Sequence, residues 1–309
     1  MYDLIIIGAG PAGMTAAVYA ARKRLKAMLL TLDIGGQVLW TQDVENYMGY
    51  QYITGAELMA KFEAQMRQYP LEIHYEKAER LEKKDGLFQV VSDAGKVYTA
   101  KTVILASGKK PRLLEVPGEQ EFVGLGVSYC ATCDGPLFAG KTVAVIGGGN
   151  SAFSAILEMS RIAQKVILIS NGRYIADAVL QEKAAALTNL KRYLPYEVRA
   201  IHGNALVTSI TVQNKETQAE EQIAVDGVFV EIGLAPNAEL AEGLVKRNAV
   251  GEIITDCTAG TSVPGLFAAG DVTSGPDKQI VIAAGDGAKA ALSAFQFLLN
   301  DKNVSSDET

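Results

Sequence analysis

The pattern of apolar positions in the first thirty-odd residues predicts a strand, a tight turn, a helix and a second strand. The stretch DLIIIGAGPAGMTAAVYAARK (3–23) begins with a continuous apolar run, crosses a glycine-rich turn and continues with closely spaced alanines. Strands that are buried on both faces are continuously apolar, as in parallel sheets. Together with the next apolar run, KAMLLTL (26–32), the pattern predicts one βαβ unit.

The segments that follow predict further elements around this sheet. An amphipathic pattern over 55–69 predicts a helix, and the stretch 72–93 predicts hairpin-like strands. Within that stretch, the charged run from Lys77 to Lys84 is typical of a solvated face and a turn. The apolar run KTVILASG (101–108) predicts another buried strand, which ends at a turn of small residues.

The same pattern restarts in the middle of the chain. The stretch 141–163 again predicts a strand, a glycine turn and a helix, and the apolar runs 165–170 and 226–237 predict the second and last strands of this unit. The chain then returns to a strand and turn at 265–274 and a helix at 283–300.

This order of elements predicts an α/β fold with two nested Rossmann-like dinucleotide-binding domains, the second inserted into the first. We expect the first domain to comprise residues 1–113 and 241–309, and the inserted domain to comprise residues 114–240. The chain crosses between them near EVPGEQ (115–120) and GLAPNAEL (233–240), and no low-complexity linker separates them.

The first glycine turn, GAGPAG, matches the fingerprint of a dinucleotide site. Its glycines permit a tight turn, close approach of the backbone to a pyrophosphate, and close packing of helix on strand. The helix N-terminus also attracts phosphate; the alternative is a turn with only a structural role. The predicted cofactor-binding residues here are Gly8, Gly10, Pro11, Ala12 and Gly13. Asp33 lies at about the spacing of a ribose-binding acid, just past the predicted strand.

The second glycine turn, GGGNSA, has the same context and spacing. Its predicted cofactor-binding residues are Gly147, Gly149, Asn150, Ser151 and Ala152. Two such turns imply two dinucleotides, or one dinucleotide and a duplicated fold with an empty second site. The strand that follows ends in Ser170 and Asn171, which are neither the acid typical of NADH sites nor the arginine pair typical of NADPH sites, and Arg173 is the nearby cation.

The pair Cys130 and Cys133 in SYCATCDGPLF (128–138) allows a metal site, buried packing or a working dithiol. Zinc usually takes four Cys and His ligands, and the other candidates, Cys257, His74 and His202, are scattered along the sequence. In a C-x-x-C pair, one thiolate attacks a partner disulfide and the other resolves the mixed disulfide. The spacing therefore favours a redox dithiol.

Two neighbouring features bear on this interpretation. Asp134 directly follows the pair and is a candidate acid–base for a leaving thiolate, with a turn or cap role as the alternative. Cys257 is predicted to be a lone, packed cysteine.

Composition narrows the function classes. The net charge of −6 argues against a general nucleic-acid binder or a binder of anionic membranes. The longest apolar runs are shorter than the roughly 20 residues that span a bilayer, and the first residues lack the basic region of a signal peptide. Three cysteines do not make a secreted disulfide scaffold, so we expect a cytoplasmic protein.

Taken together, these motifs resemble those of the low-molecular-weight thioredoxin reductases over essentially the whole chain. The motifs that carry the resemblance are GAGPAG, GGQ (35–37), ENYMG (45–49), ASG (106–108), CATCD (130–134), GGGNSA and GLFAAGD (265–271). The resemblance implies an FAD domain that is split by an inserted nicotinamide domain, and this inserted domain also carries the dithiol.

The resemblance also implies roles for individual residues. Gly8, Gly10 and Gly13 would face the FAD pyrophosphate, and Asp271 would hold its ribitol or phosphate hydroxyls. Cys133 would lie nearer the flavin, and Cys130 would attack the partner. The further residues implied at the FAD site are Gly35, Gly36, Gln37, Asn46, Ser107, Gly108, Gly270, Lys278, Gln279 and Ile280.

Several motifs are also similar to the reductase portion of the alkyl hydroperoxide reductase flavoprotein. These are CDGPLF, VIGGGNSA, IGLAPN and KQIVIAAGDGAKAALSAFQFL. That family carries an additional N-terminal thioredoxin-like module, whereas this sequence starts at the FAD strand. We therefore expect a separate acceptor, a thioredoxin- or glutaredoxin-like protein, which would connect the chain to a peroxiredoxin system.

The expected reaction passes electrons from NADH or NADPH through FAD and the Cys130–Cys133 pair to a protein disulfide. Because SNGRYIA (170–176) lacks the basic cluster of typical NADPH-using members, the donor stays open, and ferredoxin is an alternative. The resemblance further implies a homodimer and a hinge rotation of the inserted domain. Rival interpretations are a peroxide-forming NADH oxidase and a non-catalytic redox sensor.

Overall fold

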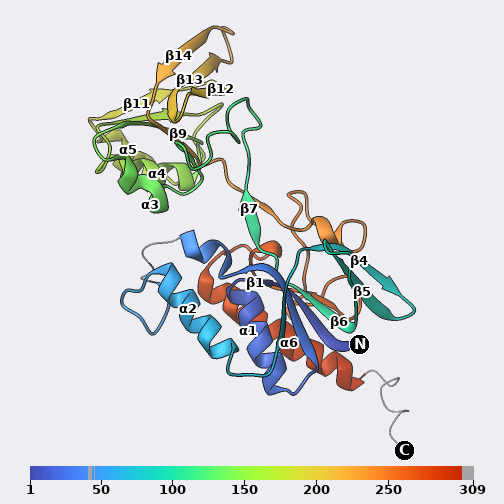
Figure 1. Ribbon diagram of the computed structural model, residues 1–309. Helices are drawn as coiled ribbons and strands as arrows, with labels where there is room; N and C mark the ends of the chain where they lie inside the picture. Colours follow the sequence, from blue (N-terminus) through green and yellow to red (C-terminus); the bar gives the residue numbers. More distant parts are fainter. Residues whose placement is uncertain (41–43, 45, 301–309) are drawn as a thin grey trace, which may run out of the picture. The chain divides into compact units, whose positions relative to one another are not determined.

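The computed structural model describes residues 1–40, 44 and 46–300 and divides the chain into two units (Figure 1). One unit contains residues 1–110 and the segment that starts at Ala235, and the other contains residues 111–234. The unit boundaries lie a few residues before those expected, because the crossings are formed by the paired strands β7 (Lys109–Pro111) and β16 (Leu234–Pro236). The α/β fold class is confirmed.

The first unit is built on a seven-stranded sheet in the order β3–β2–β1–β6–β5–β4, with β17 also paired to β6. Strands β1, β2, β3, β6 and β17 pair in parallel, and β4, β5 and the start of β6 form antiparallel hairpins. Their bounds are β1 Tyr2–Ala9, β2 Ala27–Ile34, β3 Glu72–Tyr75, β4 Ala78–Lys84, β5 Leu87–Ser92, β6 Val97–Leu105 and β17 Leu266–Ala268.

Alternate residues of the central strands enter two different cores. Leu4 and Ile6 of β1 face a core shared with the helices, whereas Ile5 and Ile7 face a core that includes Phe88 of β5. The first unit's helices are α1 (Pro11–Arg22), α2 (Gly55–Met66) and α6 (Ile280–Asn300), with short 3-10 turns η1 (Gly36–Trp40), η3 (Glu239–Ala241) and η4 (Gly270–Val272).

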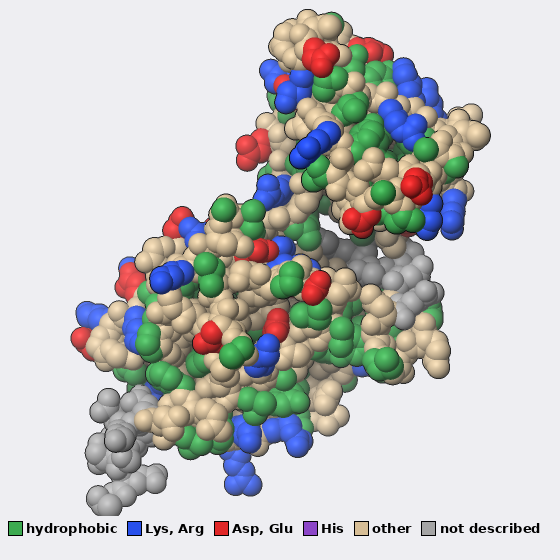
Figure 2. Space-filling view, turned by 180° about the vertical axis from the view of Figure 1, so that it is seen from behind, with side chains coloured by type: hydrophobic (Ala, Val, Ile, Leu, Met, Phe, Trp, Pro, Cys, Tyr) green, Lys and Arg blue, Asp and Glu red, His purple; other side chains and the backbone are tan. Residues whose placement is uncertain are grey.

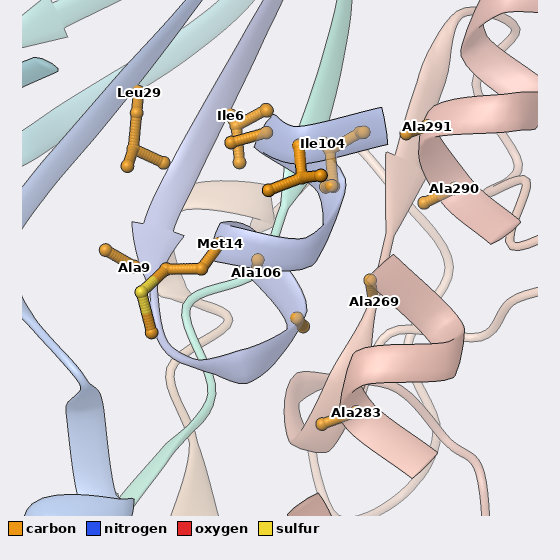
Figure 3. Close-up of a cluster of buried hydrophobic side chains, with 14 of the residues drawn as sticks. Ile6, Ala9, Met14, Leu29, Ile104, Ala106, Ala269, Ala283, Ala290 and Ala291 are labelled. Atoms are coloured by element: carbon orange, nitrogen blue, oxygen red, sulfur yellow. The ribbon is translucent and has the colours of Figure 1, made fainter. Parts of the chain in front are cut away.

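Helix α6 packs against α1 through small side chains. In the core close-up, the labelled side chains of α6 are Ala283, Ala290 and Ala291 (Figure 3). A Cβ atom on Gly287 would lie 2.0 Å from the backbone oxygen of Ala12, so only glycine permits this approach. The alanine-rich pattern of the sequence thus brings the two helix backbones into near contact.

Three local expectations are corrected by the structure. Asp33 lies inside β2, because the strand continues to Ile34. The charged run from Lys77 is mostly strand β4, in which Leu81 is buried and most other residues are exposed, and the turn comes later at Asp85. The helix predicted over 55–69 ends at Met66, and it begins with a capping box formed by Thr54 and Glu57.

The second unit repeats the strand–turn–helix start around its own five-stranded parallel sheet, in the order β11–β10–β9–β15–β8. The predicted last strand, 226–237, is interrupted after β15, and its remainder forms β16. The bounds are β8 Val127–Ser128, α3 Ala131–Asp134, η2 Gly135–Phe138, β9 Thr142–Ile146, α4 Asn150–Met159, β10 Lys165–Ile169, α5 Ala178–Ala185, β11 Leu190–Tyr193 and β15 Gly227–Val230.

The two faces of this sheet are covered differently. Residues of α4 and α5 pack on one face, where Phe153 is fully buried. The other face packs on an antiparallel meander, β12 (Tyr196–Gly203), β13 (Val207–Asn214) and β14 (Glu220–Ala224). The apolar pattern of the sequence did not lead us to predict this meander.

Acidic and basic side chains both occur on the visible face of each unit (Figure 2). Among residues 1–40, 44 and 46–300, no helix combines the length and apolar character needed to cross a membrane.

The contact between α1 and α6 predicts opposite effects for two glycines of the same helix. Gly287→Ala should destabilise the protein by about 1–3 kcal/mol, because the added methyl group collides with the backbone of Ala12. Gly285→Ala should stabilise it by up to about 1 kcal/mol, because Gly285 is exposed and its Cβ would meet no atom within 4 Å. Urea unfolding of both variants measures the difference, and equal effects would contradict the packing.

Candidate functional site

The first glycine turn is held by two backbone contacts. Gly8 has a φ of 102°, and a Cβ there would lie 2.4 Å from the Ala106 oxygen. A Cβ on Gly13 would lie 1.7 Å from the Gly8 oxygen. The middle glycine of the turn differs, because a Cβ on Gly10 would meet no protein atom within 4 Å. Gly10 is therefore where a ligand has room to approach the backbone.

A cavity of about 1210 Å³ opens beside this turn, entirely within the first unit. No side chain caps α1, so the N–H groups of its first turn are available to an anion. The predicted site residues that line the cavity are Gly8, Gly10, Pro11, Ala12, Gly36, Gln37, Ser107, Gly108, Gly270, Asp271, Lys278, Gln279 and Ile280. Its volume and anion-binding turn fit a large dinucleotide such as FAD.

Three predicted residues do not line this cavity but contact residues that do. Gly13 lies beneath the turn, against Gly8. Gly35 has a φ of 109°, and its Cβ would lie 2.8 Å from the side chain of Leu39. Asn46 contacts the cavity wall indirectly, because its Nδ2 donates to Oε1 of Gln279 at 3.0 Å and Gln279 lines the cavity.

The acidic end of the cavity was only partly anticipated from the sequence. Asp33 lines the cavity, as do Glu76, Lys77 and Glu79 in the segment after β3. The charged run was expected to be solvated, but β3 pairs with β2, so the segment after β3 comes close to Asp33. The signal was available, since ligands of open α/β sheets bind at the carboxyl ends of parallel strands.

A cluster of charges includes two lysines, Lys109 and Lys278, that line the cavity. The carboxylate of Glu252 accepts from Nζ of Lys109 at 2.8 Å and lies 3.2 Å from Nζ of Lys278. Burial acts to raise the pKa of Glu252, but hydrogen bonds from both lysines and Asn248 outweigh it and lower the pKa to about 2. Lys109 was not among the predicted site residues. It contacts one of them, because the side chain of Gln37 donates to its backbone oxygen.

Asp271 lies near the same cluster. Burial raises the pKa of Asp271, while Lys278 and Lys109 act in the opposite direction. Its neighbour Gly270 has a φ of 73°, in the left-handed region that favours glycine, and a Cβ there would lie 3.0 Å from the Ala12 side chain. The loop thus places an aspartate beside the start of α1.

The second glycine turn lies in the other unit and is equally constrained. Gly147 has a φ of 148°, and its Cβ would lie 2.2 Å from the backbone oxygen of Glu231. Gly149 precedes α4, whose first residues are Asn150 and Ser151, and Ala152 is fully buried beneath the turn. The predicted residues therefore come together, separately from the first site.

The cysteine segment also belongs to the second unit. Cys130 is disulfide-bonded, whereas Cys257 is a free thiol. The side chain of Cys133 lies outside what the structure describes. Cys130 immediately precedes α3, and the backbone N–H of Asp134 donates to the Cys130 oxygen at 3.2 Å. The prediction for Cys257 was wrong, because it is exposed and not packed.

Metal binding finds no support in the part of the chain that the structure describes. There, no group of three His, Cys, Asp or Glu side chains is placed to hold a metal ion. His74 lies beside Tyr98, with Nδ1 3.3 Å from the hydroxyl group, and His202 Nε2 lies 2.7 Å from Oγ1 of Thr211.

Comparison with known proteins identifies the class of protein. The family model described as Pyridine nucleotide-disulphide oxidoreductase matches residues 2–287. The chain is 36% identical to thioredoxin reductase of Lactococcus lactis (FR conformation), with a TM-score of 0.84 and coverage of 97% of this chain and 99% of that one. It is 38% identical to T. acidophilum thioredoxin reductase, with a TM-score of 0.80 and the same coverage.

Relatives with named activities include longer proteins. The chain is 44% identical over 302 residues to a Bacillus subtilis (strain 168) protein named NADH dehydrogenase, covering 97% of this chain and 59% of that protein. It is 41% identical over 309 residues to an alkyl hydroperoxide reductase protein of Escherichia coli (strain K12), covering 98% and 59%. The chain thus spans about three-fifths of the length of these relatives.

The chain belongs to the pyridine nucleotide-disulphide oxidoreductase family. Within it, the solved structures that the chain resembles over nearly its whole length are thioredoxin reductases, as the sequence resemblance predicted.

Because the space above Gly10 is open, we predict that a substitution there impairs cofactor binding without impairing folding. The backbone of Gly10 is extended, so Gly10→Val should fold normally, but its side chain enters the cavity and should abolish flavin binding. Gly13→Ala should instead destabilise the protein even without flavin, because its Cβ collides with Gly8. The flavin absorbance of each purified variant and the thermal unfolding of its flavin-free form measure both effects. Full flavin content in Gly10→Val would contradict the assignment.

The lowered pKa of Glu252 predicts that its contribution to the stability of the protein depends on pH. Because its folded-state pKa is lowered, that contribution is complete above the ordinary value of 4.5 and is lost as the pH falls towards about 2. Glu252→Gln should destabilise the protein by about 2–3 kcal/mol at neutral pH, and this difference should shrink on acidification.

The exposed pair Lys110–Glu239 provides the control for this experiment. Both side chains are more than half exposed, so Glu239→Gln should change stability little at any pH. Urea unfolding of both variants between about pH 2 and about pH 7 checks the expectation. A pH-independent effect of Glu252→Gln would count against it.

Proposed function

We propose that the protein is a flavin-dependent disulfide reductase. It takes electrons from NADH or NADPH and passes them through FAD and the Cys130–Cys133 pair to a thioredoxin- or glutaredoxin-like protein disulfide. The observation that carries the proposal is the disulfide bond of Cys130 in the unit that holds the second glycine turn. The other unit contributes the dinucleotide-sized cavity.

The residues of the first unit would hold and orient the flavin. FAD, when bound, supplies the hydride acceptor and delivers an electron pair to the disulfide. The turn around Gly10 would bind its pyrophosphate through backbone N–H groups. Asp33 would accept from ribose hydroxyls, and the cations Lys109 and Lys278 also line the cavity.

The residues of the second unit would carry out the thiol chemistry. Reduction of the Cys130–Cys133 disulfide takes up two electrons and two protons and yields two thiols. Cys130, as a thiolate, would attack the partner disulfide, and Cys133 would resolve the mixed disulfide, releasing the partner as a dithiol. Asp134 would exchange the proton of a leaving thiolate.

This chemistry requires the second unit to move. The second glycine turn and the cysteine pair both belong to that unit, yet the hydride donor and the disulfide must each reach the same flavin. We therefore include in the proposal a hinge rotation of the second unit about the crossings β7 and β16.

The relatives bear on both the donor and the partner, and the residues after β10 bear on the donor. The relatives' names, NADH dehydrogenase and alkyl hydroperoxide reductase, favour NADH and a link to a peroxiredoxin system. The residue that follows β10 offers no charged selectivity group, since Ser170 is buried and its hydroxyl group donates to the Gly172 oxygen at 3.1 Å. This feature keeps ferredoxin as the second candidate donor. The homodimer and the cytoplasmic location stay predictions.

The Cys130→Ser and Cys133→Ser variants test the proposed dithiol. Each should abolish NAD(P)H-dependent reduction of a thioredoxin disulfide, because one half of the exchange pair is lost. Each should retain bound flavin, since the FAD cavity lies in the other unit. The assay follows donor oxidation with thioredoxin as acceptor, next to the flavin content of each variant.

Cys257→Ser is the matched control, because Cys257 is exposed and free. It should leave turnover unchanged. Retained disulfide reduction in either active-site variant would refute the dithiol role. Donor-driven oxygen uptake that is equal in all variants, without disulfide reduction by the wild type, would instead point to a peroxide-forming oxidase.

A further inference from the structure

The first turn of α4 begins at the second glycine turn, but its two polar side chains are bound to acidic residues. Nδ2 of Asn150 donates to Oδ2 of Asp177 at 3.0 Å, and Oδ1 of Asn150 accepts the backbone N–H of Asp177 at 2.7 Å. The hydroxyl group of Ser151 donates to the carboxylate of Glu231. Both polar side chains at the start of α4 therefore already donate a hydrogen bond to a carboxylate.

Glu231 is held directly against this turn. It follows β15, and its backbone oxygen occupies the space that a Cβ on Gly147 would need. Burial raises the pKa of Glu231, although hydrogen bonds from Ser151 and the backbone N–H of Ala131 act in the opposite direction. A charged carboxylate at this position is thus costly, yet close to where the nucleotide phosphates are expected.

The other charged groups around Glu231 do not neutralise it. Glu158 of α4 acts to raise its pKa further and is itself bound by Oγ1 of Thr132 at 2.9 Å. Asp177 faces the same helix end through Asn150. Cys130, beside α3, is in a disulfide and carries no charge. Three carboxylates, those of Asp177, Glu158 and Glu231, thus lie around the start of α4. The nearby cation is Arg173, whose backbone oxygen would lie 3.5 Å from a Cβ on Gly148.

The first glycine turn lacks this arrangement. The first residues of α1 are Pro11, Ala12 and Gly13, none of which has a side-chain donor that a carboxylate could take up. The adjoining cavity has carboxylates as well, but it is also lined by the cations Lys109 and Lys278. The two turns share their glycine spacing, and only the second has carboxylates bonded to the side chains that begin its helix. These contacts weaken the second turn as a phosphate site.

We propose that Glu231 is a positioning residue that sets the affinity of the second glycine turn for a nucleotide pyrophosphate by controlling the Ser151 hydroxyl group. An ionised carboxylate only accepts hydrogen bonds, so Ser151 must donate to it and presents only lone pairs to a phosphate. A protonated Glu231 can donate to Ser151 Oγ, which frees the serine proton for a phosphate oxygen. The state of Glu231 thus decides whether Ser151 attracts or repels the nucleotide.

This inference rests on the proposed nicotinamide site and predicts the direction of its pH dependence. As the pH rises through the raised pKa of Glu231, the carboxyl group ionises, Ser151 turns its donor to it, and nucleotide affinity falls. Low pH therefore favours binding. Because the effect acts on phosphate, adenosine should bind without this pH dependence.

The test is calorimetric titration of the flavin-loaded protein with ADP-ribose, NAD⁺ and NADP⁺ between about pH 5 and about pH 8. ADP-ribose contains the pyrophosphate but no nicotinamide, so binding is measured without turnover, and bound FAD keeps the probe out of the first site. Glu231→Gln should bind ADP-ribose about tenfold more tightly at the highest pH, a ratio typical of one charge-assisted hydrogen bond, and its affinity should not vary with pH.

Two further variants separate the hydroxyl mechanism from a simple loss of charge. In a Ser151→Ala background, Glu231→Gln should lose most of its effect, because the group through which it acts is absent. Glu158→Gln removes a nearby carboxylate that contacts Thr132 and not the turn, and it should change affinity much less than Glu231→Gln.

The possible outcomes distinguish this inference from the function on which it rests. Tighter, pH-independent binding by Glu231→Gln, with the effect lost in the Ser151→Ala background, supports the inference. Binding by the wild type that is unaffected by pH and by Glu231→Gln overturns it and leaves the proposed nicotinamide site intact. Failure of the wild type and of Glu231→Gln to bind any nucleotide at any pH overturns both.

Discussion

Close backbone packing at the first glycine turn is the constraint on which the first unit depends. Gly13 lets α1 begin directly against the oxygen of Gly8, and Gly287 lets α6 approach the backbone of Ala12. These contacts leave no room for side chains, so the uncapped N-terminus of α1 and the open space above Gly10 both face the cavity. The packing that stabilises the fold thereby also shapes the proposed phosphate site.

The second unit shows that the same backbone motif need not give the same electrostatics. The turn at Gly147 is as tightly constrained as the first, but Asn150 and Ser151 are engaged by carboxylates. A strong site suits a resident cofactor, and a weaker site suits a substrate that must leave after each turnover. In the proposed reaction, FAD stays bound and the nicotinamide nucleotide exchanges. A stronger first turn and a weaker second turn would match these two roles.

The elements with strong local signals could be predicted from the sequence, and those set by tertiary contacts could not. The two glycine turns and the buried strands that precede them follow from continuous apolar runs and from glycine spacing. Asp33 was placed just past its strand because pairing of Ile34 with Ala9 of β1 extends β2 beyond the apolar run. The segment 76–79 looked like solvated charge, since only the sheet order brings it to the cavity. Glu231 and Glu252 carry no local motif, because their roles arise from partners distant in the sequence.

The central claim is that one flavin and one disulfide work together as a redox pair, and counting electrons tests it most directly. The purified flavoprotein would be titrated anaerobically with NADH and, separately, NADPH or dithionite, while flavin bleaching and free thiols are recorded. The account predicts uptake of two electron pairs per flavin, one by the flavin and one by the disulfide of Cys130, and only one pair in Cys130→Ser. Complete bleaching after a single pair in the wild type, with no new thiols, would contradict it.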